Sequence, residues 1–305
     1  MQSELFSVSS FKAEESLGPG VFEDESIQAP LSISAKSLLL FQLADSSVPT
    51  GGFAHSNTVE AAHQLKLISP STYPLLHHIW DVLLNCISSG IPFLLNSVHL
   101  IKKIAMDSND VVNSEGAVLD DKRKSIIQQW MELDAKYDAT ITSHVMRRAS
   151  SIQGSGMLRA YAVAFPSLAV WLKVLKRHLI KCTIVEGRER GHAATVFGAI
   201  CGLLQLDDAT VASMFIYTNA RDMVSAAVRM NLVGPLEGGS LINQLCHAGS
   251  LVVDEVLSYR DGITFNDIAA HQVAPLVEIV SVNELFLYTK YMFLEASVRH
   301  GELTI

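Results

Sequence analysis

The feature that most constrains the fold is the spacing of apolar residues, which recur every three or four positions along most of the chain. The clearest case follows Pro166, where an apolar helical face lies opposite a basic one. The apolar face consists of Leu168, Trp171, Leu172, Leu175 and Leu179, and the basic face of Lys173, Lys176, Arg177 and Lys181. No segment shows the sustained alternation of a half-buried strand. The sequence therefore predicts an all-α protein.

Length and composition predict one folded domain with an N-terminal extension. The 305 residues are 49% hydrophobic and 18% charged, which fits a single-domain multi-helix bundle over residues 35–305. Residues 1–34 are rich in Ser, Glu, Gly and Pro and lack periodicity, so we expect a disordered acidic tail.

Proline, glycine and polar stretches predict the helix boundaries. In the first half of the chain we expect helices over 73–86 and 93–106 with a break at Ser88–Pro92, a mobile loop over 107–121 and a helix over 122–146. A break follows at Pro166, and further helices are expected after Gly191–His192 and from Asp207 or Asp208 to Val233. We then expect a stop and loop over Gly234–Gly239 and at least two helices from Leu241 onward, one broken at Asp261–Gly262 and one ending near His300. The small residues Gly198 and Gly202 should let a neighbouring helix come close.

The charge and the chain start restrict the location and the partners. A net charge of −8 argues against nucleic acid. Residues 1–30 lack the basic start and apolar core of a signal peptide. The longest apolar run, Ala193–Leu204, is shorter than the ~20 residues that span a bilayer. We expect a soluble cytoplasmic protein that binds no membrane.

The candidate metal ligands are poorly spaced. The pairs His77–His78 and Cys246–His247 are neighbours on helices and point about 100° apart. No Cys-x-x-Cys or His-x-His motif occurs. We expect no metal site, no cofactor, and reduced buried thiols. The four cysteines are Cys86, Cys182, Cys201 and Cys246.

Motifs typical of catalysis are also missing from the sequence. There is no Gly-x-Ser-x-Gly elbow, no phosphate loop ending in Gly-Lys-Ser/Thr and no His-Glu-x-x-His pair. We therefore expect no enzymatic activity and name no catalytic residue.

One stretch, Ser37–Ala62, combines an apolar helix, a sharp turn and a second helix. The first helix has almost no polar face and should be buried. Pro49 ends it, and Gly51 and Gly52 permit positive φ in the turn. Phe53 and His55 lie on the turn, Ser56 or Asn57 can cap the second helix, and Glu60 lies in its first turn. A simple helix corner would explain the glycines equally well.

Two arginine features could serve recognition. Arg147 and Arg148 lie close to Gln153 and Gly154, and Arg221 and Arg229 lie on an otherwise apolar helix. Guanidinium groups recognise anions by planar, bidentate contacts. The alternative is that they pair with carboxylates inside the protein, such as Asp222.

Four segments resemble the urease accessory protein F family. The word PTGGFAHS at 49–56 resembles the family's N-terminal signature, although Thr58 and Val59 replace its usual glycine and leucine. The later words are RRASSIQG, GHAATVFGAICGLL and VSAAVRM, in the family's order, so that the resemblance spans about residues 37–292. The C-terminal word is poorer, since Ser281 and Tyr288 fit but Glu284 and Leu285 replace a histidine and a glutamate.

The resemblance implies an all-α homodimer that joins accessory proteins D (also called H) and G, a GTPase, to deliver nickel to apo-urease. It implies these partner-binding residues: Pro49, Thr50, Gly51, Gly52, Phe53, His55, Ser56, Glu60, Arg147, Arg148, Gln153, Gly154, His192, Arg229 and Tyr288. Two alternatives stay open beside this scaffold. One is regulation of the partner GTPase by a side chain such as Arg147, Arg148 or Arg229, and the other is a helical bundle that binds a small molecule.

Overall fold

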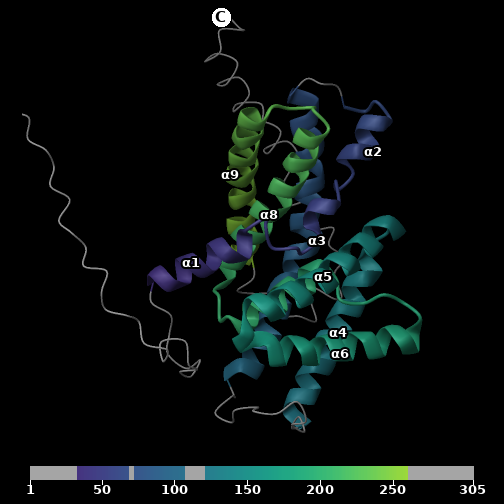
Figure 1. Cartoon of the computed structure of the whole chain (residues 1–305), viewed down its shortest axis with the longest axis vertical. Helices are drawn as coiled ribbons and strands as arrows, with labels where there is room; N and C mark the ends of the chain where they lie inside the picture. Colours follow the sequence, from purple (N-terminus) through teal and green to yellow (C-terminus); the bar gives the residue numbers. More distant parts are fainter. Residues whose placement is uncertain (1–32, 69–71, 107–120, 260–305) are drawn as a thin grey trace, which may run out of the picture. The chain divides into compact units, whose positions relative to one another are not determined.

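The structure is a computed structural model that describes residues 33–68, 72–106 and 121–259 (Figure 1). These residues form helices and connections without a strand, which confirms the all-α prediction. In chain order the elements are α1 (Ile33–Ala44), η2 (Gly52–Ala54), α2 (Val59–Gln64), α3 (Thr72–Met106), α4 (Asp121–Thr140), α5 (His144–Ala164), η3 (Pro166–Leu168), α6 (Ala169–Glu186), α7 (Ala193–Leu203), α8 (Asp208–Arg229) and α9 (Pro235–Tyr259).

Contacts divide the chain into two units, Met1–Leu38 and Leu39–Ile305. Residues 33–38, the first part of α1, are all that the structure describes of the first unit. The disordered tail expected over 1–34 stays a prediction, because nearly all of it lies outside the described residues. The same holds for the loop expected over 107–121 and for the helices expected beyond Tyr259.

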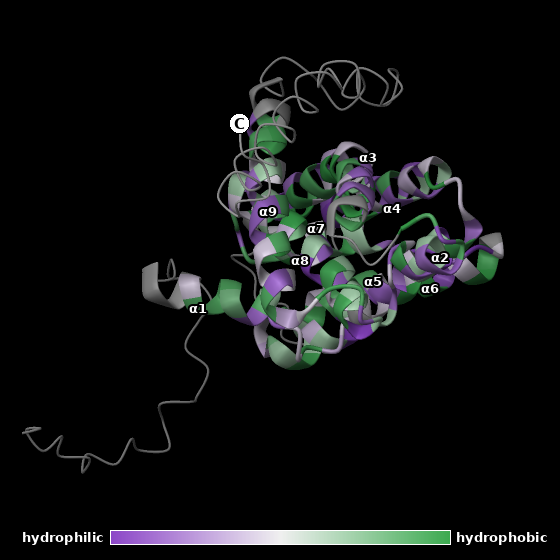
Figure 2. Ribbon diagram, turned by 90° about the horizontal axis from the view of Figure 1, so that it is seen from above, coloured by the Kyte–Doolittle hydropathy of each residue, from purple (hydrophilic) through white to green (hydrophobic). Residues whose placement is uncertain are grey.

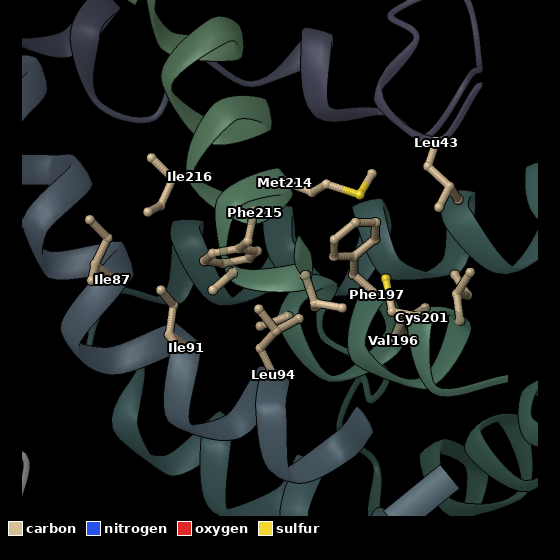
Figure 3. Close-up of a cluster of buried hydrophobic side chains, with 14 of the residues drawn as sticks. Leu43, Ile87, Ile91, Leu94, Val196, Phe197, Cys201, Met214, Phe215 and Ile216 are labelled. Carbon is tan, nitrogen blue, oxygen red and sulfur yellow. The ribbon is translucent and has the colours of Figure 1, made fainter. Parts of the chain in front are cut away.

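Helix α3 is the central element of the second unit and packs against α4, α7, α8 and α9. Its buried residues follow the helical period, as Leu83, Ile87, Ile91 and Leu94 illustrate. Figure 3 shows three of them in one apolar cluster with side chains of α7 and α8. By length and composition, Leu75–Ile104 could also span a membrane. In the 18-residue apolar window of this segment, however, 56% is buried within the protein, as in the core helix of a soluble protein.

Helix α7 comes close to α3 because its glycines face the α3 backbone. A Cβ atom on Gly198 would contact the carbonyl oxygen of Leu94, and one on Gly202 would lie 2.8 Å from that of Val98. The expected close approach of a neighbouring helix is therefore confirmed.

The expected break at Ser88–Pro92 is wrong, since α3 continues through Pro92. Proline lacks an N–H and costs a helix interior about 3 kcal/mol. Neighbouring hydroxyls bond within the helix, with Ser88 and Ser89 donating to the carbonyl of Asn85 at 3.2 and 2.6 Å. Burial of the apolar residues on both sides of Pro92 stabilises the continuous helix by more than this local cost.

The helix expected over 122–146 is instead two helices. Helix α4 ends at Thr140 and α5 begins at His144. Ser143 caps α5, since its hydroxyl accepts a hydrogen bond from the Met146 amide at 3.4 Å. A serine before a helical stretch is an N-cap signal. The apolar periodicity continues across this boundary and therefore favours a single long helix.

The glycine-rich segment after α8 is helical, not the loop that we expected. Helix α8 begins after its cap Asp207, as predicted, but ends at Arg229 instead of Val233. Helix α9 then begins at Pro235, which suits a first helical position because its missing N–H would have no partner there.

The prediction that the first helix is buried is also wrong. Phe41 is 72% exposed and Leu38 is 68% exposed, whereas Leu43 is buried. An apolar composition predicts burial only where another element covers each face, and here only the face of Leu43 packs into the core.

Helix α6 has the amphipathic character that its sequence predicts (Figure 2). Leu172, Leu175 and Leu179 are buried, while Arg177 and Lys181 are exposed. The preceding break at Pro166 is confirmed, with η3 between α5 and α6.

Substitution of Gly198 tests the contact between α3 and α7. We expect Gly198→Ala to lower the free energy of unfolding by about 1–3 kcal/mol, because the added methyl meets a backbone carbonyl that cannot move freely. The control is Gly239→Ala in α9, where a Cβ has open space, and which should gain up to about 1 kcal/mol of helix propensity. Urea unfolding measures both, and equal stabilities for the two variants would contradict the tight contact.

Candidate functional site

The turn that follows α1 has the tight course that its glycines predict. Gly51 has a φ of +90°, in the left-handed region. Its carbonyl accepts from the Ala54 amide at 3.1 Å, and that of Gly52 accepts from the His55 amide at 3.2 Å, which forms η2. Gly52 has no positive φ, so the conformational argument holds for Gly51 alone.

Gly52 is needed for close approach instead. Gly52 is buried, and a Cβ at this position would contact the Asp222 carboxylate and lie 2.8 Å from the side-chain nitrogen of Gln153. The turn thus fits between α5 and α8, which carry Gln153 and Asp222. Sequence segments about 100 and 170 residues away therefore meet the turn.

Helix α5 carries two glycines that point to opposite sides. A Cβ on Gly156 would lie 2.5 Å from the carbonyl oxygen of Thr50, in the turn. A Cβ on Gly154 would contact the carbonyl of Gly191, just before α7. Helix α5 is therefore held between the turn and the start of α7.

Asp222 and Arg221 form a buried ion pair beside the turn. The Asp222 residue is 5% exposed, and its Oδ1 accepts from Arg221 Nη2 at 2.8 Å and Nε at 3.1 Å. The alternative that these arginines pair internally is thus confirmed for Arg221. Burial raises the pKa of the Asp222 carboxyl, while Arg221 and Arg229 lower it in part.

The same arginine holds the end of α1. Arg221 Nη1 donates to the carbonyl of Ala44, and the Tyr161 hydroxyl donates to that of Leu43 at 2.9 Å. The last carbonyls of a helix lack partners within it and attract cations. Arg221 therefore connects α8 to the chain entering the turn, and it also pairs with the neighbouring Asp222 of the same helix.

A second polar cluster lies at the start of α7. Asp134 is fully buried and accepts from the amides of Gly191 and His192 at 2.8 and 2.9 Å and from the Thr195 hydroxyl at 2.5 Å. A carboxylate at a helix N-terminus is favoured by the free amides and by the helix dipole. Asp134 thus fixes the start of α7 to α4.

One helical turn later, Asp138 binds two predicted site residues. Its Oδ1 lies 3.1 Å from His192 Nε2 and 3.2 Å from Arg147 Nε. The Arg147 Nη2 group also donates to the carbonyl of Ile141 at 2.6 Å. Arg147 and His192 therefore join α4, α5 and α7 through Asp138, and of the two only His192 is buried.

The structure separates the predicted site residues into interior and surface groups. Gly52, Gly154 and His192 are buried, and His192 has no exposed surface, so none of these three side-chain positions can contact a partner directly. Pro49, Glu60, Arg148 and Arg229 are exposed, and Thr50, Gly51, His55, Ser56, Arg147 and Gln153 are half-buried. The turn carries Phe53, and Tyr288 lies outside the described residues.

The residues that replace the family's usual glycine and leucine begin α2. Thr58 has a φ of +76°, which is costly for a β-branched residue. Its hydroxyl lies 3.1 Å from His78 Nε2 of α3. The position needs the conformation that glycine adopts readily, and in this chain a side-chain hydrogen bond helps to hold it.

The polar groups that complete the site were only partly visible in the sequence. The sequence offers the pairing of Arg221 with Asp222 as an alternative, but it gives no role to Asp134 and Asp138. Their spacing of four residues places both on one face of α4, which the sequence does show. The spacing does not identify the groups that these two carboxylates bind.

Within the ranges that the structure describes, no three His, Cys, Asp or Glu side chains are placed to hold a metal ion. The four cysteines are free, and Cys201 is buried while the other three are half-buried. Burial raises the pKa of the Cys86 thiol to about 11.

Comparison with known proteins finds relatives of this sequence. The family model described as UreF matches residues 103–246. Urease accessory protein F of Arabidopsis thaliana is 31% identical over 250 residues, covering 82% of this chain and 89% of the relative. Urease accessory protein F of Oryza sativa subsp. indica is 30% identical over 251 residues, covering 82% of both chains.

A fungal relative extends the range. Urease accessory protein 6 of Cryptococcus neoformans is 26% identical over 245 residues, covering 70% of this chain and 77% of the relative. The fold and these relatives define an accessory protein of urease maturation. The chain belongs to the urease accessory protein F family.

The fit of Gly52 between α5 and α8 gives a direct test. We expect Gly52→Ala to lower the free energy of unfolding by about 1–3 kcal/mol, because its methyl displaces Asp222 or Gln153. Gly234→Ala, where a Cβ has open space, is the matched control. Chemical unfolding compares them, and a Gly52→Ala protein as stable as the control would contradict the close fit.

The pKa of Asp222 predicts a pH dependence. Because its pKa is raised on folding above the ordinary 3.8, the folded state binds more protons than the unfolded state just above that pH, and stability falls as the pH rises through this window. Asp222→Asn lacks this ionisation. The stability of the unmodified protein minus that of Asp222→Asn should therefore decrease as the pH rises from 3.8 towards neutrality. Urea unfolding across this range would disagree if the difference rose instead.

Proposed function

We propose that this protein is a non-catalytic scaffold in urease maturation. It joins accessory proteins D (or H) and G on apo-urease for the GTP-dependent insertion of nickel, which is cargo and not a resident cofactor. Membership of the urease accessory protein F family supports the role in maturation. In this proposal the protein acts in the cytoplasm as a homodimer.

The observation that carries the scaffold role is the way the turn is held. Its backbone packs against α5 and α8 through Gly52 and Gly156, and Arg221 binds the chain that enters it. Rigid positioning of the turn lets Pro49, His55 and Ser56 keep a fixed, at least partly exposed geometry. A preorganised surface loses less entropy when it binds a partner.

The arginines bear on the alternative that the protein regulates the partner GTPase. Arg147 pairs with Asp138 and has less freedom to reach a nucleotide. Arg148 is exposed on α5 and Arg229 is exposed at the end of α8, so these two are the candidates for that role. An arginine supplied in trans can raise the GTPase rate by ~10³–10⁵.

Light scattering coupled to size-exclusion chromatography tests the scaffold. We expect this chain with accessory proteins D and G to form one complex with a dimeric core of this chain. Pro49→Ala combined with Ser56→Ala should weaken that complex about tenfold or more, because central contacts dominate binding. A chain that forms no complex with either folded partner would refute the scaffold.

GTP hydrolysis within the complex separates the two roles. The scaffold role predicts that Arg148→Ala and Arg229→Ala change the rate of bound accessory protein G by less than about tenfold, whereas loss of an arginine supplied in trans would cost ~10³ or more. Lys103→Ala, at an exposed position on α3, serves as the control. A loss of that size in one arginine variant would establish the regulatory role.

A further inference from the structure

One continuous stretch of the chain has an unusual charge. From Ile141 to Val185 there are seven Lys and Arg residues and no Asp or Glu. The other 260 residues therefore carry 16 basic residues and all 31 acidic ones. This stretch comprises α5, η3 and nearly all of α6, so one helical pair of an acidic protein has seven basic residues and no acidic ones.

The exposed side of α6 places these charges in a row. Lys173, Arg177 and Lys181 are exposed and four residues apart, which aligns them along one helical face. Ile180 and Ile184, one position before and three positions after Lys181, are 50% and 77% exposed. The opposite face of α6 is the leucine face that packs against α5 and η3.

Helix α5 repeats this composition on its own exposed side. Val145, Arg148, Ile152, Arg159 and Val163 are all exposed and follow the helical period. Both helices thus present branched apolar residues next to cations.

Three basic residues of α6 are not paired with acidic groups of the described part of the chain. Surface helices normally carry both signs of charge in neighbouring turns. Within the described residues, Lys176, Arg177 and Lys181 form no ion pair. The pKa of His178 is lowered by its partial burial and by Lys181 and Arg177, as expected where positive charges repel another proton.

From this arrangement we infer that the exposed side of α6, together with that of α5, is a docking surface for an acidic, partly apolar segment of another protein. Carboxylates of that segment would bind Arg177 and Lys181, and its apolar side chains would cover Ile180 and Ile184. The residues that carry this surface differ from Gln153 and Gly156, through which α5 meets the turn, so the inference stands whether or not the turn binds accessory proteins.

Charge and side-chain type favour a protein over other anionic partners. Nucleic acids and anionic membranes carry extended negative charge, which the remaining acidic residues of this chain would repel. The exposed apolar residues of α6 are Ile and Val, without the Trp, Phe or Leu that typically enter a membrane interface.

Fluorescence anisotropy of a labelled peptide tests the inference on the full chain. The probe is a helical peptide of about 16 residues with Glu and Leu on one face, a length that spans α6. We expect saturable binding at about 50 mM salt that weakens about tenfold at about 300 mM. Arg177→Glu combined with Lys181→Glu should weaken binding about tenfold or more, and Ile184→Ser should weaken it about threefold.

The control is Lys66→Glu combined with Lys103→Glu, which changes the net charge equally at exposed positions outside this pair of helices. We expect it to change peptide affinity by less than about twofold, since distant surface charges are screened. Circular dichroism establishes that each variant is folded. Equal weakening by both double variants would overturn the inference.

Two further probes separate the competing partners. Phosphatidylserine vesicles should bind more weakly than the peptide, and so should single-stranded DNA as long as the peptide. If either bound more tightly and lost its binding in the variant with both Arg177→Glu and Lys181→Glu, the surface would belong to a membrane or a nucleic acid, and the inference would be wrong.

Discussion

The close packing of α5 is the constraint on which the candidate site depends. Gly156 admits the carbonyl of Thr50 on one side, and Gly154 admits that of Gly191 on the other. A helix without side chains at these two positions can hold the turn and the start of α7 at the distance of backbone contact. Packing at this distance is sensitive to a single added methyl group, because protein interiors are dense and relax only in part.

Buried charges complete what the glycines begin. Asp222 lies beneath the turn and pairs with Arg221, while Asp134 and Asp138 bind the segment that leads into α7. Each carboxylate has specific donors, so hydrogen bonds and ion pairs offset its burial, although only in part for Asp222, whose pKa stays raised. The result is a site in which backbone, glycine and buried charge define the geometry, and a smaller set of exposed side chains remains for binding.

Periodicity was sufficient to predict the helical class, and local signals predicted several boundaries, including the break at Pro166 and the cap Asp207. It failed where tertiary packing overrides local preference, as at Pro92 within α3. It also failed for α1, because an apolar sequence shows that burial is favourable but not which element covers the helix.

In the candidate site, the turn could be recognised from its residues. The burial of His192 and the roles of Asp134 and Asp138 required the three-dimensional contacts, since a sequence does not state which distant backbone amides a carboxylate will meet.

The left-handed backbone at Thr58 links two positions that are 20 residues apart. Thr58 tolerates a conformation suited to glycine while its hydroxyl contacts His78. The two residues should therefore be inherited together: a relative that keeps glycine at the first position has no use for the hydrogen-bonding ring at the second. A relative with glycine at the first position would lack the hydroxyl that contacts this ring in the present chain.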